Sequence, residues 1–459
     1  MSKQFPQRPS IKRGSLGRGL AVSIAGLRAG GAFALGSALG KLRGDEAQSS
    51  EMLRREARRF TAELGRLKGS YVKIGQMMAL LGEHFLPPAL TDALHDLESQ
   101  THPLDWSELE PGVRKSLGKR HRELHIQRKA LAAASLAQVH RVRRRSDGAE
   151  LVLKVQYPDL AAVIDDDFDA VVRMLLLARW IKAGRDLDEW LKQMRDQLHL
   201  EIDYQREFDM TRQARERFVD ECRYAKTYYV PEVYADYSGE TLLALEFIDG
   251  VGVNSAEVAA LSQTRRNALG IAMLELFFIE LYEWGVLQTD PNFGNYLIRS
   301  SDDSDQLVLL DFGSTIACDD DFRHHFGNAI AAGQIGDHRL LLDSLRGLEC
   351  LPDDATEFAR ETFAEFCEML LEPLRKPGDL PPEFLNAKGE YCWGSSQLMR
   401  RVGKHAASSA ATRHFATPSR DFALIVRKLT GVFTFISVLD AEFNGYELVH
   451  RYIDDWIGD

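Results

Sequence analysis

The spacing of hydrophobic and polar positions predicts helices at both ends of the chain. Residues 46–100 carry apolar side chains at helical spacing, interrupted at the Pro-Pro pair 87–88. Further helical patterns cover residues 159–218, and from about residue 320 onward the pattern is helical, with interruptions at several prolines.

Strand patterns are confined to the middle of the chain. Residues 136–144 and 150–156 alternate on either side of a Ser-Asp-Gly turn, which predicts a β-hairpin. Residues 241–248, 295–299 and 306–310 are short apolar runs that predict further strands. This order of elements is typical of a two-lobed α+β fold rather than a doubly wound sheet.

The changes in pattern along the chain divide it into four predicted regions. A Gly/Ala-rich arm comes first, followed by a helical extension, a lobe with a small sheet and inserted helices, and a mainly helical lobe. In that order, the regions cover residues 1–45, 46–128, 129–249 and 250–459.

The charge is unevenly distributed. The 459 residues carry 57 Lys+Arg against 68 Asp+Glu, a formal net charge of −11. Residues 1–44 contain eight basic and no acidic residues, so the rest of the chain has 49 basic against 68 acidic residues, a net −19. An acidic body argues against nucleic-acid binding, whereas a basic arm suits an anionic membrane surface.

The arm is not expected to span a membrane. In residues 19–40, the apolar side chains contribute roughly −3 kcal/mol to insertion, and Arg28 cancels this with about +2.5 to +3.5 kcal/mol. Glycines four residues apart, at Gly26/Gly30 and Gly36/Gly40, allow close helix contact. We predict a peripheral, membrane-apposed or self-associating helix that would make a homodimer; the alternative is a disordered leader.

The cysteines do not form a redox or zinc motif. The chain has five, an odd number, and no two are close enough for a CxxC pair. They are predicted to be reduced thiols of a cytosolic protein. The five are Cys222, Cys318, Cys350, Cys367 and Cys392.

The chemistry is concentrated in residues 285–314. Asp290 is followed five positions later by Asn295, and Asp311-Phe312-Gly313 directly follows a predicted strand. In protein-kinase-like enzymes such an Asp orients the nucleophile or accepts its proton, while the Asn and the strand-terminal Asp hold Mg²⁺. The alternative is an ordinary turn and strand exit, but both motifs in this order favour catalysis.

A kinase-like site also needs a lysine on a strand. Lys154 has apolar neighbours in the predicted hairpin, where a lysine is costly unless it is paired. The preceding loop, Ala132-Ala133-Ala134-Ser135, lacks glycine, although its backbone amides can still approach phosphates.

Several acidic residues could partner this lysine. Glu201, Asp203 and Glu207 are close in sequence on a predicted helix, and spacing alone does not choose among them. The acidic run 165–167 is predicted to be a solvated helix start.

These residues resemble the UbiB/AarF family of atypical protein-kinase-like proteins, which is linked to coenzyme Q (ubiquinone) biosynthesis. Four motifs carry the resemblance, over roughly residues 10–450. They are Lys73-Ile74-Gly75-Gln76 (KxGQ), the alanine-rich loop 132–135, Glu201-Ile202-Asp203 (ExD), and the Asp-Pro catalytic loop with Asp311-Phe312-Gly313.

The resemblance implies a protein-kinase-like fold whose N-terminal helical extension covers the nucleotide site. Lys73 and Gln76 would project into the pocket, and Glu201 and Asp203 would secure the cover. Lys154 would pair with Glu207 and contact the α- and β-phosphates.

The resemblance also implies ATP and Mg²⁺ as cofactors. The loop Ala132–Ser135 would tune nucleotide preference, and the segment from Glu246 to Ile248 would offer backbone groups to adenine. Asp290, Asn295 and Asp311 would manage Mg²⁺ and the γ-phosphate.

The expected function is ATP hydrolysis that supports quinone-lipid biosynthesis, because the cover would obstruct a peptide substrate. The alternatives are a small-molecule phosphotransferase like aminoglycoside or choline kinases, and a nucleotide-binding scaffold without turnover. Expected partners are quinone-biosynthesis proteins, quinone and lipid intermediates, and an anionic membrane at whose inner, cytoplasmic face the protein would sit peripherally.

Two departures from the kinase and family patterns limit the resemblance. No His-Arg precedes Asp290 and nothing after Gly313 resembles an APE segment, so control by activation-loop phosphorylation is not expected. The last 28 residues are also too polar to cross a bilayer, unlike the C-terminal spans of many bacterial relatives.

Overall fold

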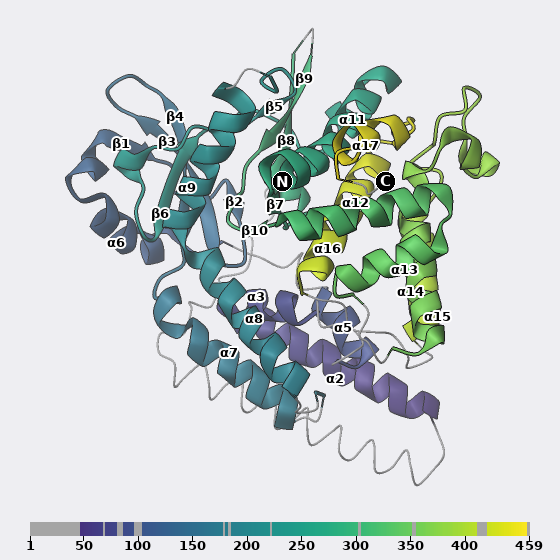
Figure 1. Cartoon of the computed structure of the whole chain (residues 1–459). Coiled ribbons are helices and arrows are strands. Elements are labelled where there is room, and N and C mark those ends of the chain that lie inside the picture. Colours follow the sequence, from purple (N-terminus) through teal and green to yellow (C-terminus); the bar gives the residue numbers. More distant parts are fainter. Residues whose placement is uncertain are drawn as a thin grey trace. The chain divides into compact units, whose positions relative to one another are not determined.

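The chain divides into two compact units (Figure 1). Unit 1 comprises Met1–Phe208 and Val233–Phe247, and unit 2 comprises Asp209–Glu232 and Ile248–Asp459. The computed structural model describes residues 46–67, 69–79, 86–95, 103–177, 180–181, 185–220, 223–301, 304–350, 355–410 and 420–456. The predicted arm, with its paired glycines and Arg28, lies outside the described residues, as does Cys222. The other four cysteines are free thiols. The four predicted regions remain predictions.

Unit 1 begins with a group of helices that share one apolar core, in agreement with the helical pattern of the sequence. Gly69 adopts a left-handed φ of +61° where the chain turns from the first helix into the second, a conformation that favours glycine. The second proline of the Pro-Pro pair occupies the first position of a helix, where its missing N–H costs nothing. The helices are α2 (Glu46–Leu67), α3 (Ser70–Ala79), α5 (Pro88–His95), α7 (Leu160–Leu177) and α8 (Arg185–Ile202).

The acidic run at residues 165–167 is not simply a solvated helix start, as the sequence suggested. It lies within α7, and Asp167 is 1% exposed and accepts a hydrogen bond from the Ser70 hydroxyl of α3. Asp165 pairs with Arg195 of α8 at 2.8 Å. Two of the three carboxylates therefore join α7 to neighbouring helices, and only Asp166 is fully exposed.

The small sheet of unit 1 is antiparallel, with the order β1-β3-β4-β6 and a short β2 paired to β3. The predicted hairpin forms β3 and β4, and the predicted strand at 241–248 contains β6. One face of the sheet packs on helix α6 (Trp106–Leu117), and the other contacts Tyr204. The strands are β1 (Leu124–Ile126), β2 (Ala132–Ala133), β3 (Ala137–Arg144), β4 (Glu150–Gln156) and β6 (Leu242–Glu246).

A basic surface at the β1 edge of this sheet was not anticipated from the sequence. Residues 114–145 contain eleven Lys and Arg against one acidic residue. These basic residues lie at the end of α6, in the 3₁₀ turn η2 (Gly118–Glu123), in the segment after β1, and in the second half of β3 and directly after it. Six of these side chains are exposed and make no ion pair with the described residues: Lys115, Lys119, Arg122, Arg128, Lys129 and Arg145.

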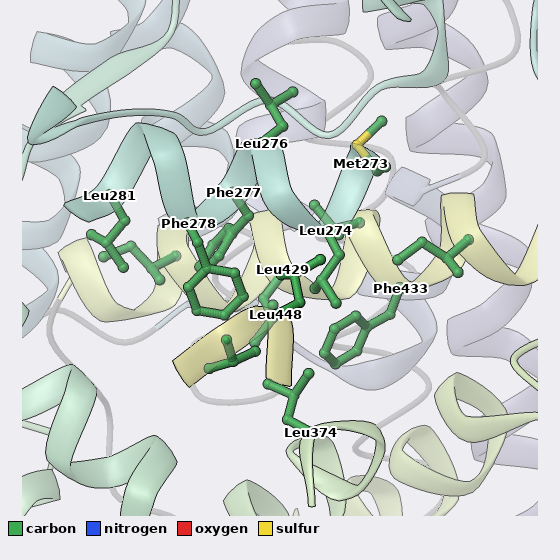
Figure 2. Packing of buried hydrophobic residues seen from close by; sticks show 14 of the residues in the cluster. Met273, Leu274, Leu276, Phe277, Phe278, Leu281, Leu374, Leu429, Phe433 and Leu448 are labelled. Carbon is green, nitrogen blue, oxygen red and sulfur yellow. The ribbon is translucent and has the colours of Figure 1, made fainter. Parts of the chain in front are cut away.

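Unit 2 is built around one large apolar core. Helix α11 (Gln263–Phe278) begins at Ser262, whose hydroxyl caps it, and its second half is buried almost all round. It packs against α16 (Arg420–Val438) and α17 (Tyr446–Ile453), and Figure 2 shows Leu274 and Phe277 of α11 close to Leu429 and Phe433 of α16. A π-helical turn, η5 (Ile279–Trp284), extends α11 toward the next strand.

Five short strands lie beside this core. The predicted strands at 295–299 and 306–310 are present to within one residue, as β8 and β9. The other strands have only two or three residues, too few to show alternation in the sequence. The five are β5 (Tyr228–Tyr229), β7 (Val286–Gln288), β8 (Tyr296–Ser300), β9 (Asp305–Leu309) and β10 (Thr315–Ala317).

The remainder of unit 2 is mainly helical, as predicted from residue 320 onward. Within the described residues, no helix is both long and apolar enough to cross a membrane. Helix α9 (Tyr204–Arg215) runs from unit 1 into unit 2, and the turn η4 (Ala235–Tyr237) belongs to unit 1. The remaining helices and helical turns of unit 2 are η3 (Glu216–Asp220), α10 (Ala256–Ala259), η6 (Phe293–Asn295), α12 (Asp320–Ile335), α13 (His338–Gly347), α14 (Glu357–Leu370), η7 (Glu372–Leu374), η8 (Pro377–Asp379), η9 (Pro382–Phe384) and α15 (Leu398–Ala410).

The packing of α13 on α14 should depend on pH. His338 contacts Glu368 at 3.3 Å and Glu361 at 2.8 Å. The hydrogen bond that His338 donates to the Glu368 carboxylate raises the pKa of His338 above 6.5; partial burial opposes this shift and the charge of Glu361 adds to it. A raised histidine pKa stabilises the folded state fully below the unfolded value, and this stabilisation is lost as pH rises through the folded pKa.

We therefore expect the free energy of unfolding of the wild type to fall, relative to His338→Gln, between about pH 6 and pH 8. Urea titrations of the two proteins at several pH values measure the difference. A wild-type stability that rises relative to the variant across this range would contradict the assignment.

Candidate active site

In unit 2, strand pairing brings the catalytic loop next to the Asp-Phe-Gly segment. β7 is antiparallel to β10. Just beyond β7, the Thr289 amide donates to the Ser314 carbonyl at 2.8 Å, and the two hydroxyls are 2.9 Å apart. Asp290, the next residue, is therefore held beside the segment 311–313.

A second strand pair brings together the two predicted metal ligands. β8 is antiparallel to β9, and just beyond their ends the Leu310 amide donates to the Asn295 carbonyl at 2.9 Å. Asp311 follows directly, and its Oδ1 accepts from the Gly313 amide at 2.8 Å, which fixes the turn. Asn295 and Asp311 thus lie at one end of the hairpin.

The carboxylate of Asp290 is held on both oxygens. The side-chain amide of Asn295 donates to Oδ2 at 3.0 Å. A guanidinium N–H of Arg427, from α16, lies 3.4 Å from Oδ1. Asp290 and Arg427 are 27% and 34% exposed, so the pair is accessible to solvent.

The donor set fits Mg²⁺ bound mainly through phosphate. The described residues contain no group of three or more His, Cys, Asp or Glu arranged to hold a metal by themselves. Because Asn295 uses its NH₂ on Asp290, its carbonyl Oδ1 is the atom left for a metal. One amide oxygen and the Asp311 carboxylate suit a hard cation that takes its other ligands from phosphates and water.

A buried lysine anchors the catalytic loop from behind. Lys428, 1% exposed, donates to Gln288 Oε1 at 2.9 Å and to the Tyr296 hydroxyl at 2.8 Å. Its charge is balanced by Glu280, also 1% exposed, at 3.5 Å. Burial raises the pKa of Glu280, and the Lys428 ammonium opposes that rise. Gln288 then donates to the Asp290 carbonyl at 2.9 Å, which connects the anchor to the predicted catalytic residue.

These supporting residues were not identified from the sequence. Lys428 stands with Arg427 between the apolar runs FALIV and LTGVF of a predicted helix, a signal similar to the one that identified Lys154 in its strand. Arg427 stands next to it and carries no motif, and it lies more than 130 positions from Asp290.

Unit 1 contains the predicted lysine and selects its partner. Lys154, in the middle of β4, pairs with Glu207 at 2.6 Å. Glu207 is 2% exposed, and Lys154 lies 5.4 Å from the centre of the Tyr204 ring. Of the three acids that the sequence left open, Glu207 is thus the one in contact with Lys154.

The alanine-rich segment forms a short strand followed by a tight turn. Ala132 and Ala133 form β2, opposite Val139 and Gln138 of β3. The Ala134 amide donates to the Ala137 carbonyl at 2.8 Å, which closes a turn with Ser135 near its tip. The turn precedes the strand pair that carries Lys154, as the proposed phosphate loop requires.

The KxGQ helix has one partly accessible face. All residues of α3 are buried except Lys73 and Gln76, which lie one turn apart. Lys73 pairs with Glu201 at 2.5 Å, the contact expected to secure the extension. Asp203 has a different role: it is exposed, and its carboxylate caps α9 by accepting from the Arg206 amide at 3.0 Å.

The predicted adenine segment lies where the chain leaves the sheet. β6 ends at Glu246, and the Phe247 amide then donates to the Glu150 carbonyl at 3.1 Å. Ile248 is 8% exposed and is the first residue of unit 2 after this crossing. Their contact with adenine remains a prediction.

Comparison with known families now identifies the domain. A model of the ABC1 atypical kinase-like domain matches residues 96–344, more than half of the chain. The chain belongs to the ABC1 atypical kinase-like family. This confirms the predicted kinship with UbiB/AarF proteins and the kinase-like α+β fold, and marks the chain as a kinase-like enzyme.

Relatives of this ABC1 chain occur in fungi, animals and bacteria. It is 31% identical over 262 residues to the mitochondrial atypical kinase COQ8 of Schizosaccharomyces pombe, covering 57% of this chain and 42% of the relative. It is 26% identical over 413 residues to mitochondrial COQ8B of Rattus norvegicus, covering 89% and 74%. The probable protein kinase UbiB of Photobacterium profundum is 28% identical over 326 residues, covering 67% and 57%.

The ABC1 chain spans only about half the length of some of these relatives, 42% for Schizosaccharomyces pombe COQ8 and 51% for that of Caenorhabditis elegans. Among solved structures, Rv3197 of Mycobacterium tuberculosis, determined with erythromycin, superposes with a TM-score of 0.58 at 20% identity. The superposition covers 89% of this chain and 98% of Rv3197, which supports the fold alone.

The buried Lys428–Glu280 pair should show strong energetic coupling. Lys428→Met leaves the Glu280 carboxylate buried without a counter-charge, and we expect it to cost about 3–5 kcal/mol of unfolding free energy. Lys428→Met with Glu280→Gln removes both charges and should recover part of this loss. Urea unfolding of the two single variants and the double variant measures the coupling, and additive losses would contradict it.

Proposed function

We propose that the chain is an atypical kinase-like ATPase that supports ubiquinone biosynthesis through Mg²⁺-dependent ATP hydrolysis rather than protein phosphorylation. The main support is that Asp290, Asn295 and Asp311 lie together at one end of the paired strands of unit 2. The COQ8 and UbiB relatives, and the motifs shared with the family linked to coenzyme Q, support the quinone assignment.

In the proposed reaction, Asp290 orients a water molecule and takes its proton as the water oxygen bonds to the γ-phosphorus. The bond from this phosphorus to the β–γ bridging oxygen breaks, and its electron pair leaves with ADP. Asn295 Oδ1 and Asp311 would hold Mg²⁺, which neutralises charge on the phosphates. The bonds to both carboxylate oxygens keep Asp290 in one orientation.

Unit 1 supplies the second group of nucleotide contacts. The Lys154 ammonium, held by Glu207, would bind the α- and β-phosphates. The backbone of the hairpin Ala132–Ser135 would follow the phosphates, and Glu246 to Ile248 would face adenine.

The α3 extension favours hydrolysis over the alternatives. Its Lys73 is tied to Glu201, so the extension is linked to the helix that leads into α9 and its Glu207. A small-molecule phosphotransferase has no need of this KxGQ element, and a peptide substrate would have to displace it.

Asp290→Asn keeps the shape of the side chain and removes the proton acceptor. We expect phosphate release from MgATP to fall by roughly 10²–10⁴-fold, with MgADP affinity changed little. Asp196→Asn, at an exposed position of α8, is the matched control and should retain wild-type release. Release and nucleotide-induced thermal shifts are measured for all three proteins.

Equal release by wild type and Asp290→Asn would contradict the assigned role. Thermal stabilisation by nucleotide without release from the wild type would identify a scaffold instead. Phosphate transfer to an aminoglycoside or choline, in place of release, would favour the small-molecule phosphotransferase.

We also propose peripheral association with the inner face of an anionic membrane, where quinone lipids and the proteins that make them would be partners. Two basic regions support this: the arm, with eight basic residues, and the exposed basic surface of unit 1, with six unpaired cations among the described residues. Each lysine or arginine near an anionic leaflet strengthens binding by about fivefold.

Removing four charges from the basic surface should weaken membrane binding. The quadruple variant Lys119→Gln, Arg122→Gln, Arg128→Gln, Lys129→Gln removes exposed charges from η2 and from the segment after β1. We expect each removed charge to lower the affinity of the full chain for phosphatidylserine-containing vesicles by about fivefold, as measured by flotation. Binding to pure phosphatidylcholine vesicles should be small for all variants.

The control changes four exposed cations of unit 2 and has the same net charge: Lys226→Gln, Arg339→Gln, Lys388→Gln, Lys404→Gln. It should float like the wild type. If both quadruple variants lose binding equally, net charge rather than this surface is responsible.

A further inference from the structure

Helix α16 contacts the catalytic loop through one face. Arg427 reaches Asp290, Lys428 reaches Gln288, and Gly431 lies against Pro291. A Cβ at Gly431 would lie 2.0 Å from the Pro291 Cβ, so the helix and the loop are in direct contact. The opposite side of α16 carries Leu429 and Phe433 into the apolar core (Figure 2).

Two of these contacts have clear structural reasons. The Lys428–Glu280 pair is fully buried and anchors the strand that precedes the loop. The glycine permits the close approach. Arg427 differs, because an ion pair exposed to this degree contributes little to folding stability. Folding stability alone therefore gives little reason for the contact between Arg427 and Asp290.

The charge of the loop explains why a cation is needed beside Asp290. Residues 285–298 contain no lysine, arginine or histidine, yet the loop carries Asp290. Within the described residues, Arg427 is the one cation within 4 Å of the Asp290 carboxylate. A carboxylate that must work next to a triphosphate is repelled by it, and a guanidinium on its far oxygen opposes that repulsion.

The geometry of the contact completes the constraint on Asp290. Asn295 donates to Oδ2 and Arg427 to Oδ1, so the carboxylate is held at both oxygens. With Oδ2 alone held, the group could rotate about its last bond, which is a broad torsion in aspartate. Two donors from two separate elements define a single orientation.

We propose that Arg427 is a positioning residue for the reaction. It acts through Asp290, holding the carboxylate in its working orientation and balancing its charge as the phosphates bind. This inference rests on the proposed hydrolysis, in which Asp290 orients the water.

The test compares Arg427→Met and Arg427→Lys with the wild type, each alone and with Asp290→Asn. We expect Arg427→Met to lower kcat by roughly 10- to 100-fold with KM for MgATP changed less than about threefold. Arg427→Lys keeps the charge and should recover part of kcat. Arg346→Met, which removes an exposed arginine paired with Asp343 at 2.8 Å in the same unit, is the matched control and should behave as wild type.

The double variants test whether Arg427 acts through Asp290. If it does, Arg427→Met has no further effect once Asp290 is Asn, so the two losses are far from additive. Additive losses would mean that Arg427 works on the phosphates by itself, which overturns the proposal. Wild-type kcat in Arg427→Met would also overturn it.

A second measurement does not depend on turnover. Carbodiimide-driven coupling of an amine to Asp290, followed by mass spectrometry, reports whether the carboxylate is held. We expect severalfold faster labelling of Asp290 in Arg427→Met than in wild type or Arg346→Met, and equal labelling would refute the contact. If the wild type releases no phosphate, the proposed function fails, and labelling alone decides the role of Arg427.

Discussion

The buried pair of Lys428 and Glu280 is the constraint on which the catalytic half of unit 2 depends. Two charges without access to water must balance each other, and the lysine satisfies its remaining donors on Gln288 and Tyr296. These two residues end β7 and begin β8, so they flank the loop that contains Asp290. The loop is thereby fixed at both ends by one side chain from a helix far away in sequence. A single interaction links the apolar core to the position of Asp290, the proposed catalytic carboxylate.

In unit 1, a break between two helices positions the acidic partners of two lysines. α8 ends at Ile202 and α9 begins at Tyr204, and the cap supplied by Asp203 stabilises the new start. The break lets two nearby glutamates serve different lysines: Glu201 binds Lys73 of the extension, and Glu207 binds Lys154 of the sheet. Had one helix continued, the directions of both carboxylates would have been fixed by helical spacing.

Elements and site residues could be predicted from the sequence where neighbouring residues carried the signal, and not where a long-range contact decided the outcome. The hairpin of β3 and β4 and the later strands β8 and β9 show alternation or apolar runs, and they were predicted almost to the residue. The short strands β7 and β10 were missed because two or three residues carry no period, and their pairing across the Asp-Phe-Gly segment is a long-range contact. Motif residues such as Asp290 and Lys154 could be named from their neighbours. Spacing alone could not choose Glu207 over Glu201; the family resemblance chose Glu207, and the helix break gives the physical reason. The prediction for Asp167 was wrong because a run of acidic residues usually faces solvent. Its hydrogen-bond donor, the buried hydroxyl of Ser70, is distant in sequence and leaves no local signal.

A chain with a net charge of −11 that hydrolyses ATP, as proposed, must place cations next to the triphosphate. The catalytic loop supplies none, since residues 285–298 contain no basic side chain. In the proposed function the cations come from three different kinds of element: Lys154 from a strand and Lys73 from the extension in unit 1, and Arg427 from a late helix in unit 2. Each is already paired with an acid, so each is oriented before any phosphate arrives, and its charge is not left uncompensated in the free protein. Such pairing limits affinity, because phosphate must compete with a carboxylate for every cation. In return it reduces the reorganisation needed when nucleotide binds, which is the condition under which electrostatic stabilisation of a transition state is most effective.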